Sequence, residues 1–199
     1  MGKNNIKRRE FLGKAALGTI GAGIGVPLLK AKTEVRNHPV EIINRTLGRT
    51  GLEIPIVSFG VMNSDSPDLI NQALDMGIKH LDTAHVYLRG NSERVIGEVL
   101  EKRGGRDKVY IATKMRLARD REKNVFVEKG SDREPPANAE GLNKQLALSL
   151  QRLRTDYVDI LYLHSIYSPE MTTFEPLMNA LVKVKKEGKA RFIGTTTHQ

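Results

Sequence analysis

Short apolar runs alternate along the chain with longer segments in which apolar positions recur three and four residues apart. A short apolar run is typical of a buried strand, whereas three-and-four spacing is typical of a helix with one buried face. The runs predict five strands, at residues 56–60, 79–82, 109–113, 158–164 and 190–195. The amphipathic segments predict helices between them, at residues 67–76, 92–102, 142–153 and 176–186. Gly48 and Gly51 predict a small hairpin ahead of this pattern.

Regular alternation of strand and helix predicts an α/β fold built from parallel units. A barrel and a doubly wound sheet both satisfy this pattern. A doubly wound sheet that binds a dinucleotide carries a Gly-x-Gly-x-x-Gly turn after its first strand. Here the first strand is followed by Val61-Met62-Asn63-Ser64, which lacks that turn. The pattern therefore favours a barrel, in which chemistry gathers on the loops at the carboxyl ends of the strands.

Four polar side chains stand at or just beyond those strand ends. Asp82 ends the second predicted strand and Tyr87 follows five residues later, while Lys114 and His164 end the third and fourth. Taken singly, each has an ordinary structural interpretation: a turn cap, an amphipathic rim residue, a solvated charge and a core histidine. Jointly they are harder to explain in that way, because polar groups directly after buried runs are costly. We therefore expect them to converge on one rim.

Five motifs in order resemble the aldo-keto reductases, from about Arg45 to the last residue. They are Arg49-Thr50-Gly51-Leu52, Gly77-Ile78-Lys79-His80-Leu81-Asp82-Thr83-Ala84-x-x-Tyr87, Ser92-Glu93-x-x-Ile96-Gly97, Ile111-Ala112-Thr113-Lys114, and Ser149-Leu150-x-Arg152-Leu153-x-Thr155-Asp156-Tyr157-Val158-Asp159. The resemblance implies a (β/α)8 TIM barrel, here truncated to about five strands, because a complete barrel of this kind needs about 250 residues.

The resemblance also implies an NADPH-dependent enzyme that reduces aldehyde or ketone carbonyls. Tyr87 then acts as the general acid, and Lys114 favours the phenolate that forms. Asp82 holds the Lys114 ammonium in place, and His164 donates a hydrogen bond to the substrate oxygen. The substrate itself stays open among sugars, steroids, quinones and small aldehydes.

Cofactor contacts are implied by the same resemblance at the first and fifth strand ends. Gly194-Thr195-Thr196-Thr197-His198 is similar to the family's segment that meets the nicotinamide carboxamide, so Thr196 and Thr197 are candidate NADP(H) contacts. Val61 and Met62 are expected near the same ring, either as contacts or as plain lining residues. Asp82 counts among the cofactor-binding residues as well. The choice between NADPH and NADH stays open.

Truncation opens two alternatives to an active enzyme. The strands that grip the cofactor phosphates in the family are expected to lie beyond this sequence, so the chain alone should bind NADPH weakly. One alternative is a catalytically inactive remnant, and the other is a regulatory or binding subunit built on the same barrel. A partial form of a longer enzyme is the interpretation that we carry forward.

Composition and charge exclude several further classes of function. The chain has 199 residues, no Cys and a net charge of +9. Residues 1–32 carry a net +6, which leaves +3 for residues 33–199, so the basic balance belongs to the leader and does not indicate a nucleic-acid partner. The absence of Cys from this sequence excludes disulfides and thiolate catalysis within it, and we expect no metal site.

The leader is typical of an export signal. Lys7-Arg8-Arg9-Glu10-Phe11-Leu12-Gly13-Lys14 precedes an uncharged Gly- and Ala-rich run over residues 15–29. This layout is similar to a twin-arginine (Tat) signal. We expect residues 1–33 to be that signal, residues 34–199 to be the partial barrel, and the Tat machinery to be a partner. The chain is then periplasmic, or membrane-anchored if the leader is not cleaved.

The segment from Arg116 to Asn138 separates the third and fourth strands by an unusually long interval. Its charges have mixed signs, which predicts a solvated loop or a short excursion. Two roles stay open: a substrate lid over the rim, or a surface insertion.

Overall fold

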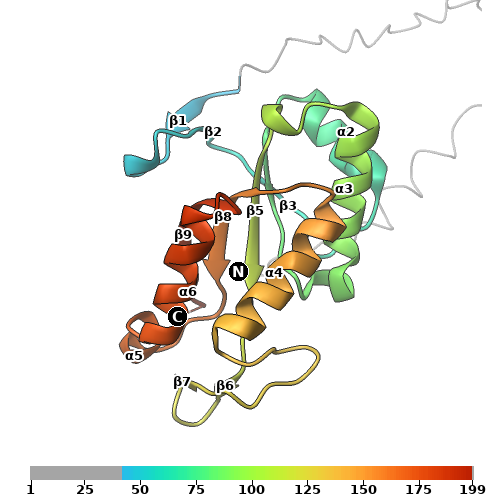
Figure 1. The fold of residues 1–199 in the computed structure, drawn as a ribbon. Coiled ribbons are helices and arrows are strands. Elements are labelled where there is room, and N and C mark those ends of the chain that lie inside the picture. Colours follow the sequence, from blue (N-terminus) through green and yellow to red (C-terminus); the bar gives the residue numbers. More distant parts are fainter. Residues whose placement is uncertain (1–41, 199) are drawn as a thin grey trace, which may run out of the picture. The chain divides into compact units, whose positions relative to one another are not determined.

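Five parallel strands form the centre of the fold in the computed structural model, which describes residues 42–198. The sheet order is β3-β4-β5-β8-β9, with β3 Phe59–Gly60, β4 His80–Asp82, β5 Tyr110–Met115, β8 Val158–Leu163 and β9 Ala190–Thr195. Each strand pairs in parallel with the next strand of this order. Chain order and sheet order agree, so each connection crosses over to the neighbouring strand (Figure 1). The predicted parallel α/β arrangement is confirmed.

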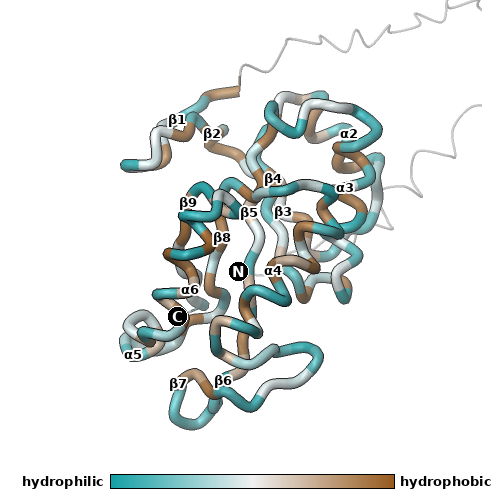
Figure 2. Tube along the Cα trace, in the orientation of Figure 1, coloured by the Kyte–Doolittle hydropathy of each residue, from teal (hydrophilic) through white to brown (hydrophobic). Residues whose placement is uncertain are grey.

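Helices occupy these crossovers. They are α2 Pro67–Asp75, α3 Asn91–Arg103, α4 Ala139–Leu153 and α6 Glu175–Lys186. Their hydropathy alternates along each helix (Figure 2), since one face packs on the sheet and the other meets solvent. The core between helices and sheet includes Ile96, Leu142, Leu161 and Val184. Asn138 caps α4, because its side-chain oxygen accepts from the Gly141 N–H at 2.9 Å.

The predicted hairpin is confirmed ahead of the sheet. It pairs β1 Asn44–Thr46 with β2 Glu53–Pro55 in antiparallel register around the 3-10 turn η1, Gly48–Thr50. Gly51 ends that turn at φ +70°, a conformation that glycine adopts without strain. Leu52 joins Ala112 and Ile160 in a small apolar cluster on the other face of the sheet.

Two strand boundaries differ from the prediction by more than one residue. The first strand begins at Phe59 and not at Ile56, whose N–H donates to the Ile43 carbonyl 2.9 Å away and so extends the hairpin. The third strand continues to Met115, because Met115 pairs with Leu163 of β8. Lys114 therefore lies inside β5 and not after it.

The segment from 116 to 138 is more ordered than a solvated loop. It contains an antiparallel pair, β6 Arg119–Asp120 and β7 Val125–Phe126. Phe126 is buried and packs against Phe174, with ring centroids 5.7 Å apart. The Ser168 hydroxyl, just before the short helix α5 (Pro169–Thr172), donates to the Asn124 carbonyl at 2.8 Å. Of the two expectations, a solvated loop or a short excursion, the excursion describes this part, because apolar side chains fix it to the chain after β8. The lid role stays a prediction.

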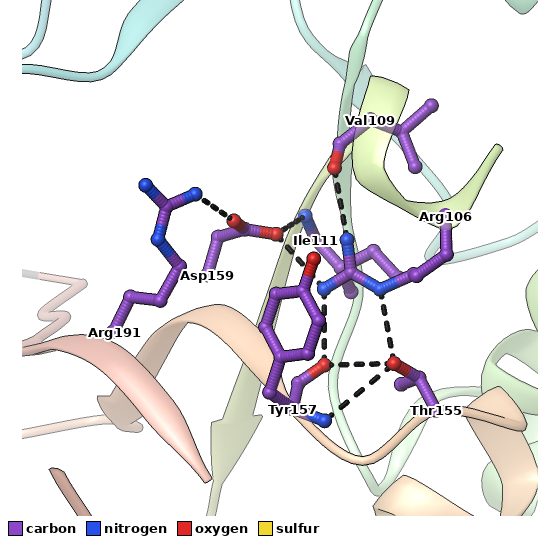
Figure 3. Close-up of polar contacts among 7 residues, drawn as sticks. All are labelled: Arg106, Val109, Ile111, Thr155, Tyr157, Asp159 and Arg191. Atoms are coloured by element: carbon purple, nitrogen blue, oxygen red, sulfur yellow. Dashed lines mark hydrogen bonds and ion pairs between the residues drawn. The ribbon is translucent and has the colours of Figure 1, made fainter. Parts of the chain in front are cut away.

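A polar cluster fixes the end of the sheet at which the strands begin (Figure 3). Asp159 of β8 is 1% exposed and accepts from Arg106, in the 3-10 turn η3 (Arg106–Lys108), at 2.9 Å. It also accepts from the Ile111 N–H at 2.9 Å and from Arg191 of β9 at 2.8 Å. Arg106 further stacks on the Tyr157 ring, 4.1 Å from its centroid. One carboxylate therefore connects β5, β8, β9 and η3 at this end.

The described part of the chain offers neither a membrane span nor a metal cluster. Within residues 42–198, no helix combines the length and apolar character needed to cross a bilayer. The same residues bring no group of three His, Cys, Asp or Glu side chains together for a metal ion. The leader expected over residues 1–33 lies outside the described residues.

Candidate active site

Asp82 and Lys114 meet at the carboxyl ends of neighbouring strands. Strand alternation places both on the same face of the sheet, since Asp82 pairs in register with Ala112, two residues before Lys114. The Lys114 ammonium forms an ion pair with the Asp82 carboxylate and donates to the Thr83 carbonyl at 2.8 Å. Lys114 is 6% exposed, so these two partners take the place of the water that would surround an exposed ammonium. The cation is thereby held in one position.

Tyr87 lies over this cation. It begins the 3-10 turn η2 (Tyr87–Gly90), and the Lys114 ammonium is 5.0 Å from the centroid of its ring. The next two residues have left-handed backbone, with φ +47° at Leu88 and +56° at Arg89, which is uncommon outside glycine. This backbone redirects the chain immediately after Tyr87.

His164 completes the group from the end of β8. The backbone N–H of His164 donates to the Met115 carbonyl at 2.9 Å. Its ring meets the Tyr87 ring edge-on, with the ring centroids 6.1 Å apart. Burial, together with the nearby positive charges of Lys114 and Arg116, lowers the pKa of His164 to about 4. The ring is therefore uncharged at neutral pH.

The four residues predicted at the rim are thus brought together by four different segments. Their side chains come from β4, from the turn after it, from β5 and from the end of β8. An uncharged imidazole and a phenol meet edge-on beside the buried Lys114 ammonium and its partly exposed Asp82 carboxylate. This arrangement can deliver a proton and stabilise a developing oxyanion.

The residues predicted to contact the cofactor do not all lie at the rim. Thr196 lies at the rim, where its hydroxyl is 2.8 Å from His164 Nδ1 and accepts from the Ser165 N–H at 3.3 Å. Thr197 follows it and is exposed. Met62 is half exposed, whereas Val61 is wholly buried and belongs to the core between sheet and helices. The backbone of Val61 serves the fold as well, since its N–H donates to the Asp82 carbonyl at 2.8 Å and its carbonyl accepts from the Ser92 hydroxyl.

Two further histidines lie near the rim, and sequence reasoning missed the first of them, His85. His85 is 5% exposed, and its Nε2 accepts from the Arg116 N–H at 2.9 Å. Burial lowers the pKa of His85 to about 4, and the charges of Arg152 and Arg116 add to this effect. His198 stacks edge-on against His164, with centroids 5.4 Å apart. The position of His85 between Asp82 and Tyr87 was the available signal for it. His198 belongs to the motif over residues 194–198, in which the resemblance gives a role only to Thr196 and Thr197.

Comparison with known proteins decides the family. The profile of the Aldo/keto reductase family matches residues 56–199. The chain belongs to the aldo/keto reductase family. It is 34% identical over 167 residues to L-galactose dehydrogenase from Arabidopsis thaliana, covering 76% of this chain and 47% of that protein. It is 34% identical over 169 residues to the NADH-specific methylglyoxal reductase of Escherichia coli K12, covering 80% and 51%.

A solved structure agrees with this membership. The aldo-keto reductase AKR11C1 from Bacillus halodurans, in its holo form, superposes with a TM-score of 0.65 at 25% identity, over 79% of this chain and 51% of that one. The predicted fold class is therefore confirmed: the five parallel strands form part of the (β/α)8 barrel type of aldo/keto reductases. The chain spans about half the length of these relatives.

Proposed function

We propose that this aldo/keto reductase chain is the catalytic-rim part of an oxidoreductase that reduces aldehyde or ketone carbonyls with NADPH. The observation that carries the proposal is the convergence of Tyr87, the Lys114–Asp82 pair and His164 on one rim. Each group supplies something that carbonyl reduction needs: a proton, a charge that favours its release, and a hydrogen bond to the carbonyl oxygen.

Tyr87 is the proton donor in this proposal. A free phenol, with a pKa of about 10, releases its proton reluctantly at neutral pH. The Lys114 ammonium, 5.0 Å from the centre of the ring, stabilises the phenolate as it forms. Asp82 and the Thr83 carbonyl keep that ammonium from moving away into solvent.

His164 orients the carbonyl in this proposal and keeps its own proton. With a pKa of about 4 it is uncharged at neutral pH, so it offers one ring N–H and one acceptor nitrogen. Its Nδ1 lies 2.8 Å from the Thr196 hydroxyl. When that hydroxyl donates to Nδ1, the Nε2–H is left to donate to a substrate oxygen.

The rim residues suit the nicotinamide end of the cofactor. Thr196 and Thr197, at the end of β9, offer hydroxyl groups for a carboxamide, and uncharged rings line the adjacent side. When bound, the reduced nicotinamide supplies the hydride for the carbonyl carbon. Thr196 is already fixed by His164 and the Ser165 N–H, so it would position the cofactor and the imidazole together.

The test is NADPH oxidation by the full chain on a generic aldehyde, compared with the Tyr87→Phe variant. General acid catalysis typically contributes about 10²- to 10⁴-fold, so the variant should lose activity by that order while its fold is unchanged by circular dichroism. Repeating the assay with NADH decides between the two cofactors. Equal rates for both proteins would refute the role of Tyr87. Cofactor binding without turnover would favour the regulatory subunit, and neither binding nor turnover would favour the inactive remnant.

We also propose that the chain is exported by the Tat route. The support is the paired Arg8-Arg9 within a basic stretch, followed by an uncharged Gly- and Ala-rich run. Expression in a Gram-negative host with and without a Tat translocase tests it, together with a variant in which Arg8 and Arg9 are Lys. Periplasmic recovery that depends on both the translocase and the arginines is expected. Recovery independent of both would refute the proposal.

A further inference from the structure

An arginine-rich cleft lies beside the turn that carries Tyr87. Its volume is about 700 Å³, and its walls come from the turn after β4, from the segment after β5 and from α4. Five arginines line it: Arg89, Arg116, Arg121, Arg133 and Arg152. Neither the proposed proton transfer nor the proposed cofactor contacts use these side chains.

The positive charge of the cleft is only partly neutralised by protein groups. Arg152 forms an ion pair with the buried Glu93, and Arg121 with Glu134, each at 3.2 Å. The other three arginines, Arg89, Arg116 and Arg133, form no ion pair within residues 42–198, and among the residues lining the cleft Asp132 is the remaining acid. Three positive charges against one leave a local excess of two.

Buried hydrogen-bond donors without partners lie in the same walls. The Nε atoms of Arg116 and Arg152 have no hydrogen-bond partner among the described residues, whereas Gln145, 7% exposed, interacts with His85. Native proteins rarely leave such donors unsatisfied. The neighbouring His85 also lines the cleft, and the charges of Arg152 and Arg116 help to keep it neutral. These donors lie beneath the cleft surface, so the charge of the lining arginines is what calls for a partner with negative charge.

We propose that this cleft binds an oxyanion: the phosphate or carboxylate group of a small molecule. A guanidinium presents parallel N–H groups that match two oxygens of such an anion, which makes arginine the preferred residue for this recognition. Because Val86, Leu88 and Arg89 line the cleft, its occupant contacts the residues on both sides of Tyr87. The proposal does not depend on turnover, so it can be tested by binding alone.

Isothermal titration of the full chain with inorganic phosphate, pyrophosphate and citrate at low ionic strength tests the proposal. Saturable binding of one of these anions is expected, and the tighter of phosphate and citrate identifies the phosphate or carboxylate class. The Arg89→Gln/Arg133→Gln double variant should bind at least about tenfold more weakly, since charge-assisted hydrogen bonds are lost. Asp132→Asn should bind more tightly, because it removes the opposing charge.

The matched control removes two arginines at a distance. Arg45 and Arg49 are exposed on the β1–β2 hairpin, which lies at the other end of the strands from the β6–β7 segment (Figure 1), and the Arg45→Gln/Arg49→Gln variant loses the same net charge. Its affinity should equal that of the unaltered chain. Equal weakening in both double variants, or unchanged binding in the cleft variant, would assign the anion to general attraction, including that of the basic leader. That result, or no binding to the unaltered chain, would overturn the proposal.

Discussion

Removing the carboxylate of Asp159 should destabilise the fold far more than removing any of its surface partners. The Asp159→Ala variant deletes one side chain that serves Arg106, Arg191 and the Ile111 N–H together. Asp159 is 1% exposed, whereas the Arg191 side chain is 48% exposed and the Arg106 side chain 19%. The loss therefore leaves a largely buried guanidinium and a buried amide without their acceptor (Figure 3).

The magnitude follows from burial. Breaking a buried ion pair by deleting one partner costs about 3–5 kcal/mol, because the other charge stays buried and unpaired. Arg191→Gln should cost less than about 1 kcal/mol, since half-exposed ion pairs contribute little. Asp159→Asn keeps an oxygen for the Ile111 N–H and so should lie between these limits, at about 2 kcal/mol.

The assay is urea-induced unfolding followed by circular dichroism, with the free energy of unfolding extrapolated to water. Asp75→Ala is the matched control, because its ion pair with Arg103 is exposed on both sides and should contribute less than about 1 kcal/mol. If Asp159→Ala lost no more stability than Asp75→Ala, the cluster would not hold the strands together and the reasoning would be refuted.

Three further outcomes are expected. In the folded chain His85 and His164 have pKa values of about 4, whereas the ordinary value is 6.5. The free energy of unfolding should therefore be highest above pH 6.5 and should fall toward pH 4, by up to roughly 3 kcal/mol for each histidine. A urea midpoint unchanged between pH 7.5 and 5 would contradict this. Gly97→Ala should lower the thermal midpoint despite better helix propensity, because the new methyl group overlaps the α4 backbone, whereas Gly60→Ala, with open space around it, should be neutral. Asp82→Asn should lower the free energy of unfolding by about 1–3 kcal/mol, since the buried ammonium loses its counter-charge; stability equal to the unaltered chain would show that the Thr83 carbonyl alone suffices.

The order of elements could be predicted from the sequence because each crossover unit buries its own apolar face. The three-and-four spacing places α4 and α6 within a few residues of their observed bounds. Boundaries fail where tertiary pairing decides them. Apolar Ile56 is exposed beside the hairpin, and Lys114 is strand because Met115 finds a partner in β8. No local pattern contains that information.

Convergence of the candidate site could likewise be predicted, since parallel strands end at the same edge. Its supporting contacts could not. The bond between His164 and Thr196 joins residues 32 positions apart, and the β6–β7 pair depends on two-residue strands that no periodicity reveals. The arginines of the cleft are scattered from residue 89 to residue 152, so their proximity follows only from the fold.

Three of the five non-glycine residues with left-handed backbone in residues 42–198 directly follow the two ring-bearing residues of the candidate site. Leu88 and Arg89 follow Tyr87, and Ser165 follows His164 at φ +64°. Such conformations cost about 1–3 kcal/mol each and persist where the surroundings fix them, which is common at functional sites. Here the rigid strands bring the chain to the rim, and left-handed residues then turn it away while leaving the two rings face to edge. None of the three is glycine, so the sequence at these positions does not predict a left-handed turn. The other two, Asn124 and Arg154, stand between β6 and β7 and at the end of α4. The strain therefore adds to the support for the proposed roles of Tyr87 and His164.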